Sequence, residues 1–349
     1  MKLYMDFKKH RMRTGTILLP LVLVMSLVAA CGGKKEIVLA GRTMGTTYHV
    51  KAVVGRFYDE AGLRVKIEKR LAEINHSMST YQPDSEISRF NRLGQAGVPF
   101  PISNDFLAVM QVARRVHALT QGAWDGTVKP LVDLWGFGKS AAVRVPSSTE
   151  ITSALSRIGF EHIEISEAGS LIKRQDGVTL DLASIAKGYG VDQIARVLSQ
   201  DGVTHYLVEI GGEVVASGNR LDGEKWKVGI NEPQSAAAYN AVYKVLKLHD
   251  QALATSGDYR NFFEMDGKRY SHVIDPRNGY PVSNGVISVS VIADNCILAD
   301  GLATAIMVIG PKGVAVIDRL ENVEGLIVVQ TAGGAVQEYA SKGFARSLL

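Results

Sequence analysis

Two neighbouring segments decide the fold class: Val286-Ile287-Ser288-Val289-Ser290-Val291-Ile292 and Leu298-Ala299-Asp300-Gly301-Leu302-Ala303-Thr304-Ala305-Ile306-Met307-Val308-Ile309. The first is short and rich in β-branched residues, which is typical of a strand. The second is an apolar run of helical length, and we expect a helix there. A strand and a helix in direct succession predict a mixed fold, and the rest of the chain extends the mixture.

Helical and strand patterns alternate from the N-terminal half onward. Apolar residues at helical spacing run from Leu63 to Met78, and Ser103 is expected to be the N-cap of a helix that ends near Leu119. Because hairpins are interspersed with helices, the expected fold class is α+β, with mixed or antiparallel sheets and flanking helices, rather than a doubly wound sheet. Further helices are predicted after Ser148-Thr149-Glu150 and over residues 185–199, a hairpin over 163–165 and 171–173, and strands over 204–209, 213–216, 226–230 and 243–248.

The N-terminus reads as a targeting segment. Five basic residues precede an apolar stretch, residues 17–30, which is too short to span a bilayer. It ends in Val28-Ala29-Ala30-Cys31-Gly32, which resembles a bacterial lipobox with Cys31 as the lipidated residue. The alternatives are an ordinary signal peptide that happens to contain a cysteine, or an uncleaved anchor. We therefore expect a signal peptide over 1–30, a flexible anchor over 31–40 and one compact, two-lobed domain over 41–349.

Charge and cysteine content narrow the function classes. Of 39 basic and 35 acidic residues, five and one lie in residues 1–30, so 34 of each sign remain in the mature chain. A neutral protein has no electrostatic surface suited to nucleic acid, and that partner is not expected. If Cys31 carries lipid, Cys296 is the only thiol left and no intramolecular disulfide can form. Stability must then come from a packed core.

Two short segments combine a titratable group with hard oxygen ligands. His272 ends an apolar run just before the turn-forming stretch Asp275-Pro276-Arg277-Asn278-Gly279, and Asp300 and Thr304 lie one helical turn apart. At this spacing the carboxylate and the hydroxyl share a helix face, and both are ligands that Mg²⁺ accepts. The alternatives are that Asp300 caps its helix with Thr304 a buried helical threonine, and that His272 only hydrogen-bonds the turn.

A third segment suits phosphate. Val178-Thr179-Leu180-Asp181-Leu182-Ala183-Ser184-Ile185-Ala186-Lys187-Gly188-Tyr189-Gly190 is predicted to form a strand, a tight turn and a helix start. Free N–H groups at a helix N-terminus attract phosphate, and Lys187 adds a positive charge. The spacing is not that of a P-loop. Alternatively, the small residues serve only close packing between strand and helix.

Other segments are less specific. The diglycine Gly211-Gly212 predicts a β-turn or a close approach of the backbone to a ligand. The loop Gly122-Ala123-Trp124-Asp125-Gly126-Thr127 and the stretch Leu134-Trp135-Gly136-Phe137-Gly138 either line a pocket for a flat ring or fill the core. Thr43-Met44-Gly45-Thr46-Thr47-Tyr48 precedes an alternating strand, and polar turns surround Tyr81 and residues 254–260.

In this order, from Arg42 to Gly310, the segments resemble the ApbE family of flavin transferases. The resemblance implies an ApbE-like two-lobed fold and a Mg²⁺-dependent reaction that uses FAD as substrate. A Thr or Ser hydroxyl of an acceptor protein attacks the phosphorus on the FMN side, AMP leaves, and FMN remains bound through a phosphoester. The implied acceptors are subunits of the sodium-pumping NADH:quinone reductase or of Rnf complexes, which carry an Asp-x-x-Ser/Thr-Gly-Ala-Thr motif.

The resemblance also assigns residues. His272 matches the histidine thought to aid transfer, with a pKa near neutrality when unperturbed, and so is the expected catalytic residue. The loop usually reads Ala/Gly-Phe-Asp, so Trp124 is a departure, as is Ser184 in place of a common Ala; neither removes a needed group. FAD-contacting positions are Met44, Tyr81, Ala123, Trp124, Asp125, Asp181, Lys187 and His272, and Mg²⁺ positions are Asp300 and Thr304 by side chain with Ser184 and Ala303 by backbone carbonyl.

Two other functions fit the same residues. Water in place of the acceptor hydroxyl would make the protein an FAD pyrophosphatase that gives FMN and AMP, and a lipid-anchored flavin-binding protein would have no activity. The resemblance places the protein on the periplasmic side of a Gram-negative membrane. Gly32 after the lipidated cysteine suggests the outer membrane, whereas the implied acceptors belong to the inner membrane.

Overall fold

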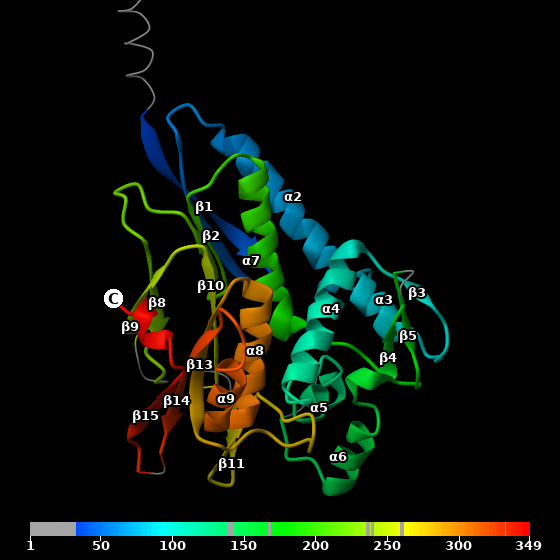
Figure 1. Ribbon diagram of the computed structural model, residues 1–349. Coiled ribbons are helices and arrows are strands. Elements are labelled where there is room, and N and C mark those ends of the chain that lie inside the picture. The colour runs from blue at the N-terminus through cyan, green and yellow to red at the C-terminus, as the bar shows by residue number, and fades with distance from the viewer. Residues whose placement is uncertain are drawn as a thin grey trace, which may run out of the picture.

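The computed structural model describes residues 33–138, 143–166, 169–234, 238, 241–258, 262–331 and 333–349. The predicted signal peptide and Cys31 lie outside these residues. An eight-stranded sheet runs through the molecule in the order β1-β2-β6-β7-β10-β13-β14-β15, and every neighbouring pair is antiparallel (Figure 1). Its strands are β1 Lys34–Thr43, β2 Thr46–Gly55, β6 Tyr206–Ile210, β7 Glu213–Ser217, β10 Gln251–Gly257, β13 Val286–Ala293, β14 Glu324–Gln330 and β15 Val336–Ala340.

Helices α7 (Ala183–Gln200) and α8 (Cys296–Ile309) pack side by side against one face of this sheet. Outside them lie α2 (Glu60–Met78) and α4 (Asn104–Leu119), which contact α7 and α8 (Figure 1). A two-stranded hairpin, β8 (Trp226–Asn231) with β9 (Val242–Leu248), contributes to the apolar cluster on the other face of the sheet. Because both faces are covered, every residue of β13 is buried and its sequence is a continuous apolar run broken only by serines.

A second lobe has its own small core. It contains α5 (Lys129–Leu134) and α6 (Ser148–Leu155), whose apolar side chains pack around Trp135 and Ile274. Beside it lie α3 (Glu86–Arg92) and a three-stranded sheet in the order β3-β5-β4 (Figure 1). The remaining elements are β3 Phe100–Pro101, β4 Ile163–Ile165, β5 Ser170–Lys173, β11 Phe262–Met265, β12 Lys268–Ser271 and α9 Val314–Ile317.

The expected α+β class with antiparallel sheets is confirmed. The flexible anchor expected over 31–40 is wrong from Lys34 on, because these residues form β1 and bury Ile37 and Leu39. The polar turn expected over 254–260 is likewise wrong as far as Gly257, because this stretch pairs with β13 as part of β10.

The predicted helices and strands of the described chain are confirmed, with one exception. Residues 178–180 are not a strand. Instead, the Asn91 side chain accepts a hydrogen bond from the Leu180 N–H at 2.7 Å and donates one to the Leu180 carbonyl at 2.8 Å. One amide side chain thus satisfies the two backbone groups that a neighbouring strand would otherwise pair.

One helical segment of the described chain, Cys296–Ile317, is long and apolar enough to cross a membrane by length and composition. Its α8 part, however, is packed between α4, α7 and strands β10 and β13, and nearly all of its side chains are buried. We therefore assign α8 to the core of the folded domain.

Candidate functional site

Asp300 lies inside α8 and does not cap it. The N-cap is Asn295, whose side chain accepts a hydrogen bond from the Leu298 N–H, so the alternative that Asp300 is a cap is wrong. The Asp300 side chain reaches the neighbouring helix, where its Oδ2 accepts a hydrogen bond from the Gly188 N–H at 2.9 Å. Only 2 % of the residue is exposed, and burial raises its pKa against the opposing charge of Lys187.

Lys187 is held by a residue to which the sequence had assigned no role. Its Nζ lies 2.6 Å from Oε1 of Glu213, the first residue of β7. Burial works to lower the pKa of Lys187, but the charges of Asp300 and Glu213 outweigh it and the pKa is raised, so the ammonium stays protonated. Burial raises the pKa of Glu213 to about 8, with Lys187 opposing. The signal available in the sequence was an ionisable residue at the start of an otherwise apolar strand.

Close helix packing brings these charges together. A Cβ on Gly188 would stand 2.4 Å from the Cys296 carbonyl oxygen, so only glycine lets α7 and α8 approach this closely. The predicted packing role of the small residues is therefore confirmed, but the partner is a helix rather than a strand. Asp192 of α7 ties the same junction, because its carboxylate accepts hydrogen bonds from the N–H groups of Cys296 and Ile297. Asp192 is another residue that the sequence did not single out.

The diglycine is the turn of the β6–β7 hairpin, as the first of the two alternatives predicted. Ile210 and Glu213 are paired across it, and Gly211 and Gly212 have φ values of +61° and +105°, a region that favours glycine. The turn also passes close to the lysine, because a Cβ on Gly211 would lie 3.4 Å from Cδ of Lys187. The hairpin therefore determines where Glu213 meets Lys187.

The other predicted metal positions lie on the same two helices. Thr304 follows Asp300 by one turn of α8, and its hydroxyl oxygen lies 3.2 Å from that of Ser256 in β10. Ala303 is fully buried beside it. At the start of α7, the Ser184 hydroxyl accepts a hydrogen bond from Nε1 of Trp124 at 3.0 Å.

The Trp124 ring does not line an open pocket in the structure. The residue is 1 % exposed and belongs to the main core, with its ring near Phe160, and Ala123 is equally buried. The alternative, that the aromatics of this loop fill the core, holds for Trp124 and also for Trp135. The structure offers FAD no exposed indole face at this position.

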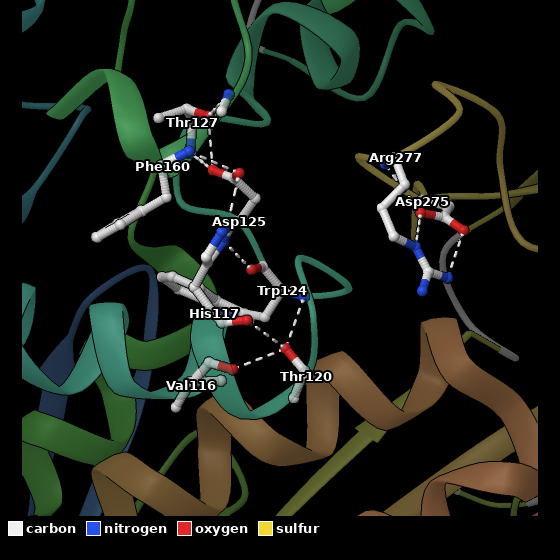
Figure 2. A network of polar contacts seen from close by, with 10 residues as sticks. Val116, His117, Thr120, Trp124, Asp125, Thr127, Phe160, Asp275 and Arg277 are labelled. Carbon is white, nitrogen blue, oxygen red and sulfur yellow. Dashed lines mark hydrogen bonds and ion pairs between the residues drawn. The ribbon is translucent and has the colours of Figure 1, made fainter.

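Asp125 anchors the same loop (Figure 2). One of its carboxylate oxygens accepts hydrogen bonds from the Thr127 N–H and hydroxyl, and the other accepts one from the Phe160 N–H. His117 lies 3.5 Å away, and its ring nitrogen is 3.0 Å from the Trp124 carbonyl oxygen. Burial raises the pKa of Asp125, while the hydrogen bonds and His117 oppose that effect. A cavity of about 350 Å³ adjoins it, lined also by Arg277 from the turn after His272.

The remaining predicted FAD positions lie in different parts of the fold. Asp181 accepts a hydrogen bond from the Ala183 N–H at 2.9 Å and so satisfies a donor of the first turn. Met44 occupies the β1–β2 turn with a φ of +49° and packs against Gly190. Tyr81 is 78 % exposed. His272 is partly buried after β12, with its ring 6.3 Å from that of Phe137. The structure thus gathers Met44, Asp181, Ser184 and Lys187 around α7, and leaves Tyr81 at the surface.

The donor set fits a hard divalent cation that keeps open coordination positions. The described residues contain no cluster of three or more His, Cys, Asp or Glu side chains suited to a metal ion. Asp300 is therefore the sole carboxylate ligand that the predicted set offers, with the Thr304 hydroxyl and backbone carbonyls beside it. Mg²⁺ is commonly bound by one or two carboxylates together with water and substrate phosphates. Beside this set, Oε2 of Glu213 is buried and has no hydrogen-bond partner among the described residues, a polar group that a bound cation or its water would satisfy.

Comparison with known proteins places this fold and site. The ApbE family model matches residues 44–327. Curated relatives named FAD:protein FMN transferase include those of Vibrio cholerae, 42 % identical over 93 % of this chain and 97 % of the relative, and of Haemophilus influenzae, 37 % identical over 93 % and 95 %. Among solved structures, the flavin transferase ApbE from Vibrio cholerae superimposes with a TM-score of 0.82 at 40 % identity, covering 90 % of this chain and all of the other. The apo form of the flavinyl transferase ApbE from Pseudomonas stutzeri gives a TM-score of 0.81 at 37 % identity, with 90 % and 97 % covered.

The fold and the paired-helix site thus define an α+β protein of the flavin-transferase type. The match to the family model and to relatives along nearly their whole length makes the assignment specific. The chain belongs to the ApbE family.

Proposed function

We propose that this protein transfers FMN from FAD to a Thr or Ser hydroxyl of an acceptor protein. The observation that carries the proposal is the similarity to FAD:protein FMN transferases over 97 % of the length of the Vibrio cholerae relative. The site supports it, because a carboxylate, hydroxyls and a lysine converge where α7 meets α8. These are groups that phosphoryl transfer requires for charge neutralisation and positioning.

Asp300 and Thr304 would hold Mg²⁺, with Ser184 and Ala303 contributing backbone carbonyls. When bound, Mg²⁺ neutralises charge on the pyrophosphate. Lys187 would direct its ammonium toward the same phosphates, and its raised pKa keeps that charge in place at neutral pH. Asp181 lies at the start of α7 and Met44 packs beside Gly190 further along the same helix, and both would orient the FAD substrate.

His272 would take the proton from the acceptor hydroxyl. The oxygen then forms a bond to the phosphorus on the FMN side, the bond from that phosphorus to the AMP oxygen breaks, and AMP leaves. FMN remains attached to the acceptor through a phosphoester. Proton removal of this kind commonly accelerates a reaction by roughly 100- to 10,000-fold.

The proposed acceptors are subunits of envelope redox complexes, such as the sodium-pumping NADH:quinone reductase or Rnf, with an Asp-x-x-Ser/Thr-Gly-Ala-Thr motif. The proposed location is the periplasmic side of the membrane, with the protein attached through lipid on Cys31. The lipobox-like sequence Val28-Ala29-Ala30-Cys31 supports the anchor.

Incubation with FAD, Mg²⁺ and an acceptor fragment that carries the motif tests the activity. We expect a fluorescent acceptor band on a denaturing gel and an equal amount of AMP, and we expect neither with Asp300→Ala, which removes the sole carboxylate of the predicted metal set. Rapid FMN release that the acceptor does not suppress would instead identify a pyrophosphatase. FAD that stays intact for hours with Mg²⁺ and acceptor would identify a binding protein.

A further inference from the structure

We propose that Glu213 is a positioning residue that holds the Lys187 ammonium away from Asp300 and so leaves the Asp300 carboxylate available to a divalent cation. This inference rests on the metal-binding role of Asp300 in the proposed function. It assigns a task to a side chain that lies outside the predicted set of ligand and FAD-contacting residues.

Lys187 has two carboxylates within reach of its charge. The N–H of Gly188, the residue that follows Lys187, donates a hydrogen bond to Asp300. The lysine backbone therefore lies close to that carboxylate. The charges of Asp300 and Glu213 both act on the lysine. In the structure, however, the ion pair of Lys187 is with Glu213, at 2.6 Å. An ammonium hydrogen-bonded to Asp300 would occupy the lone pairs that a metal ion needs.

The local backbone fixes this choice of partner. The β6–β7 turn brings the lysine stem close to Gly211, and the turn ends directly at Glu213. Glu213 is 2 % exposed and cannot swing into solvent, so it offers the ammonium a fixed acceptor on the side of the sheet. Among the described residues, the Asp300 carboxylate on the side of α8 accepts its hydrogen bond from the Gly188 N–H.

The pair is poorly satisfied for a structural ion pair. Oε2 of Glu213 is buried and has no hydrogen-bond partner in the described part of the chain, and burial of an incompletely satisfied carboxyl group costs stability. Replacement of such pairs by neutral residues is often tolerated or stabilising in other proteins. The stability of the fold therefore does not explain why a buried Glu213–Lys187 pair is present at this position. Control of the charge beside Asp300 does explain it.

A double-mutant cycle on Mn²⁺ binding tests the proposal without turnover. Mn²⁺ would be titrated into the full-length protein and its free fraction followed by electron paramagnetic resonance. Glu213→Gln should weaken Mn²⁺ binding about 10- to 100-fold, the range seen when a residue that orients a metal ligand is removed. In Lys187→Met, which has no ammonium to restrain, adding Glu213→Gln should leave the Kd unchanged within about twofold, since the two effects act through one contact.

The proposal is overturned if the double variant binds Mn²⁺ more weakly than Lys187→Met by the same factor by which Glu213→Gln binds it more weakly than wild type. Glu213 would then act on the metal ion directly, either as a ligand or through its own charge. Mn²⁺ binding that survives Asp300→Asn would also overturn it, because the probe would then sit elsewhere. If Glu213→Gln does not fold, Lys187→Met can still be compared with the double variant, in which both residues of the pair are neutral. Equal Kd values for Mn²⁺ would support the proposal, and a weaker Kd for the double variant would overturn it.

Glu60→Gln is the matched control. It removes one carboxylate from another lysine pair, Lys35 with Glu60 at 2.5 Å, but at the surface, and should leave the Kd for Mn²⁺ unchanged. The gel assay separates this inference from the proposed function. If the acceptor is labelled but the effects of the two substitutions on Mn²⁺ binding are additive, only this inference is overturned. If the two effects are not additive but the acceptor is not labelled, only the proposed flavin transfer is overturned.

Discussion

At the scale of single residues, the site depends on what a side chain lacks as much as on what it carries. Gly188 has no Cβ, and this absence lets the backbone of α7 touch the first turn of α8. Its N–H consequently reaches Asp300 at 2.9 Å. A residue with no functional group thereby places the predicted metal ligand.

Gly188→Ala is expected to lower the free energy of unfolding. The new Cβ would lie 2.4 Å from the Cys296 carbonyl oxygen and 2.8 Å from Cα of Ile297, both rigid backbone. Alanine is favoured over glycine inside a helix by up to about 1 kcal/mol. Overpacking typically costs roughly 1–3 kcal/mol, so we expect a net loss. Urea unfolding followed by circular dichroism measures it.

Gly190→Ala, in the same helix, serves as the control. Its Cβ would meet Cε of Met44 at 2.9 Å, and that is the far end of a flexible side chain. The Gly190→Ala loss should therefore be smaller than the Gly188→Ala loss. Equal losses would show that the contact with the α8 backbone is not the cause.

At the scale of elements, a charged network joins three helices. Arg70 of α2 donates two hydrogen bonds to Asp105 of α4, at 2.7 Å and 2.5 Å, and the Tyr189 hydroxyl of α7 donates a third at 2.5 Å. Burial alone would raise the pKa of Asp105, but the hydrogen bonds from Arg70 and Tyr189 and the arginine charge outweigh it and lower the pKa. The ionised carboxylate is therefore the form that the folded protein favours.

Asp105→Asn should destabilise the protein in a pH-dependent way. A carboxyl whose pKa is lower in the folded state stabilises the protein above its unfolded pKa of about 3.9 and loses this contribution as pH falls through the folded value. We expect the variant to be about 2 kcal/mol less stable at pH 7, the scale of hydrogen bonds to a charged group. The difference between wild type and variant should shrink below about pH 4. Urea unfolding at pH 7, 5 and 3 measures it.

Glu164→Gln is the control for this prediction. It breaks the exposed Arg174–Glu164 pair, 3.4 Å apart, and surface pairs contribute at most about 1 kcal/mol. A difference for Asp105→Asn that stays constant from pH 7 to pH 3 would contradict the assigned cause, because an uncharged packing effect does not titrate.

The elements themselves were largely predictable, because their signals are local. Ser103 caps α4 as expected, and the apolar spacing from Leu63 to Met78 matches the buried face of α2. The exception, residues 178–180, has a strand-like sequence but takes its backbone partners from the side chain of Asn91, 89 residues earlier. The periodicity of a sequence does not show which distant side chain will form hydrogen bonds with the N–H and carbonyl groups of a segment.

At the scale of the whole molecule, the predicted lipid anchor is separable from the site. Cys31→Ser is expected to release the protein into the soluble fraction while labelling of the acceptor fragment stays unchanged, because every predicted site residue lies after residue 40. Fractionation and the gel assay measure the two outcomes. Loss of labelling with a detergent-solubilised acceptor fragment would mean that the anchor contributes to the site, and continued membrane association would point to another attachment.

Periodicity, capping and the order of motifs are local properties, so the α+β class, most element positions and the residue types of the site could be predicted before the fold was known. The contacts of those residues are defined only in the folded chain. Trp124 is buried in the core, Asp300 lies inside its helix rather than at the N-cap, and Lys187 pairs with Glu213. The physical reason is that contact between α7, α8 and β7 depends on layer packing around a glycine and on burial, which a linear pattern does not encode.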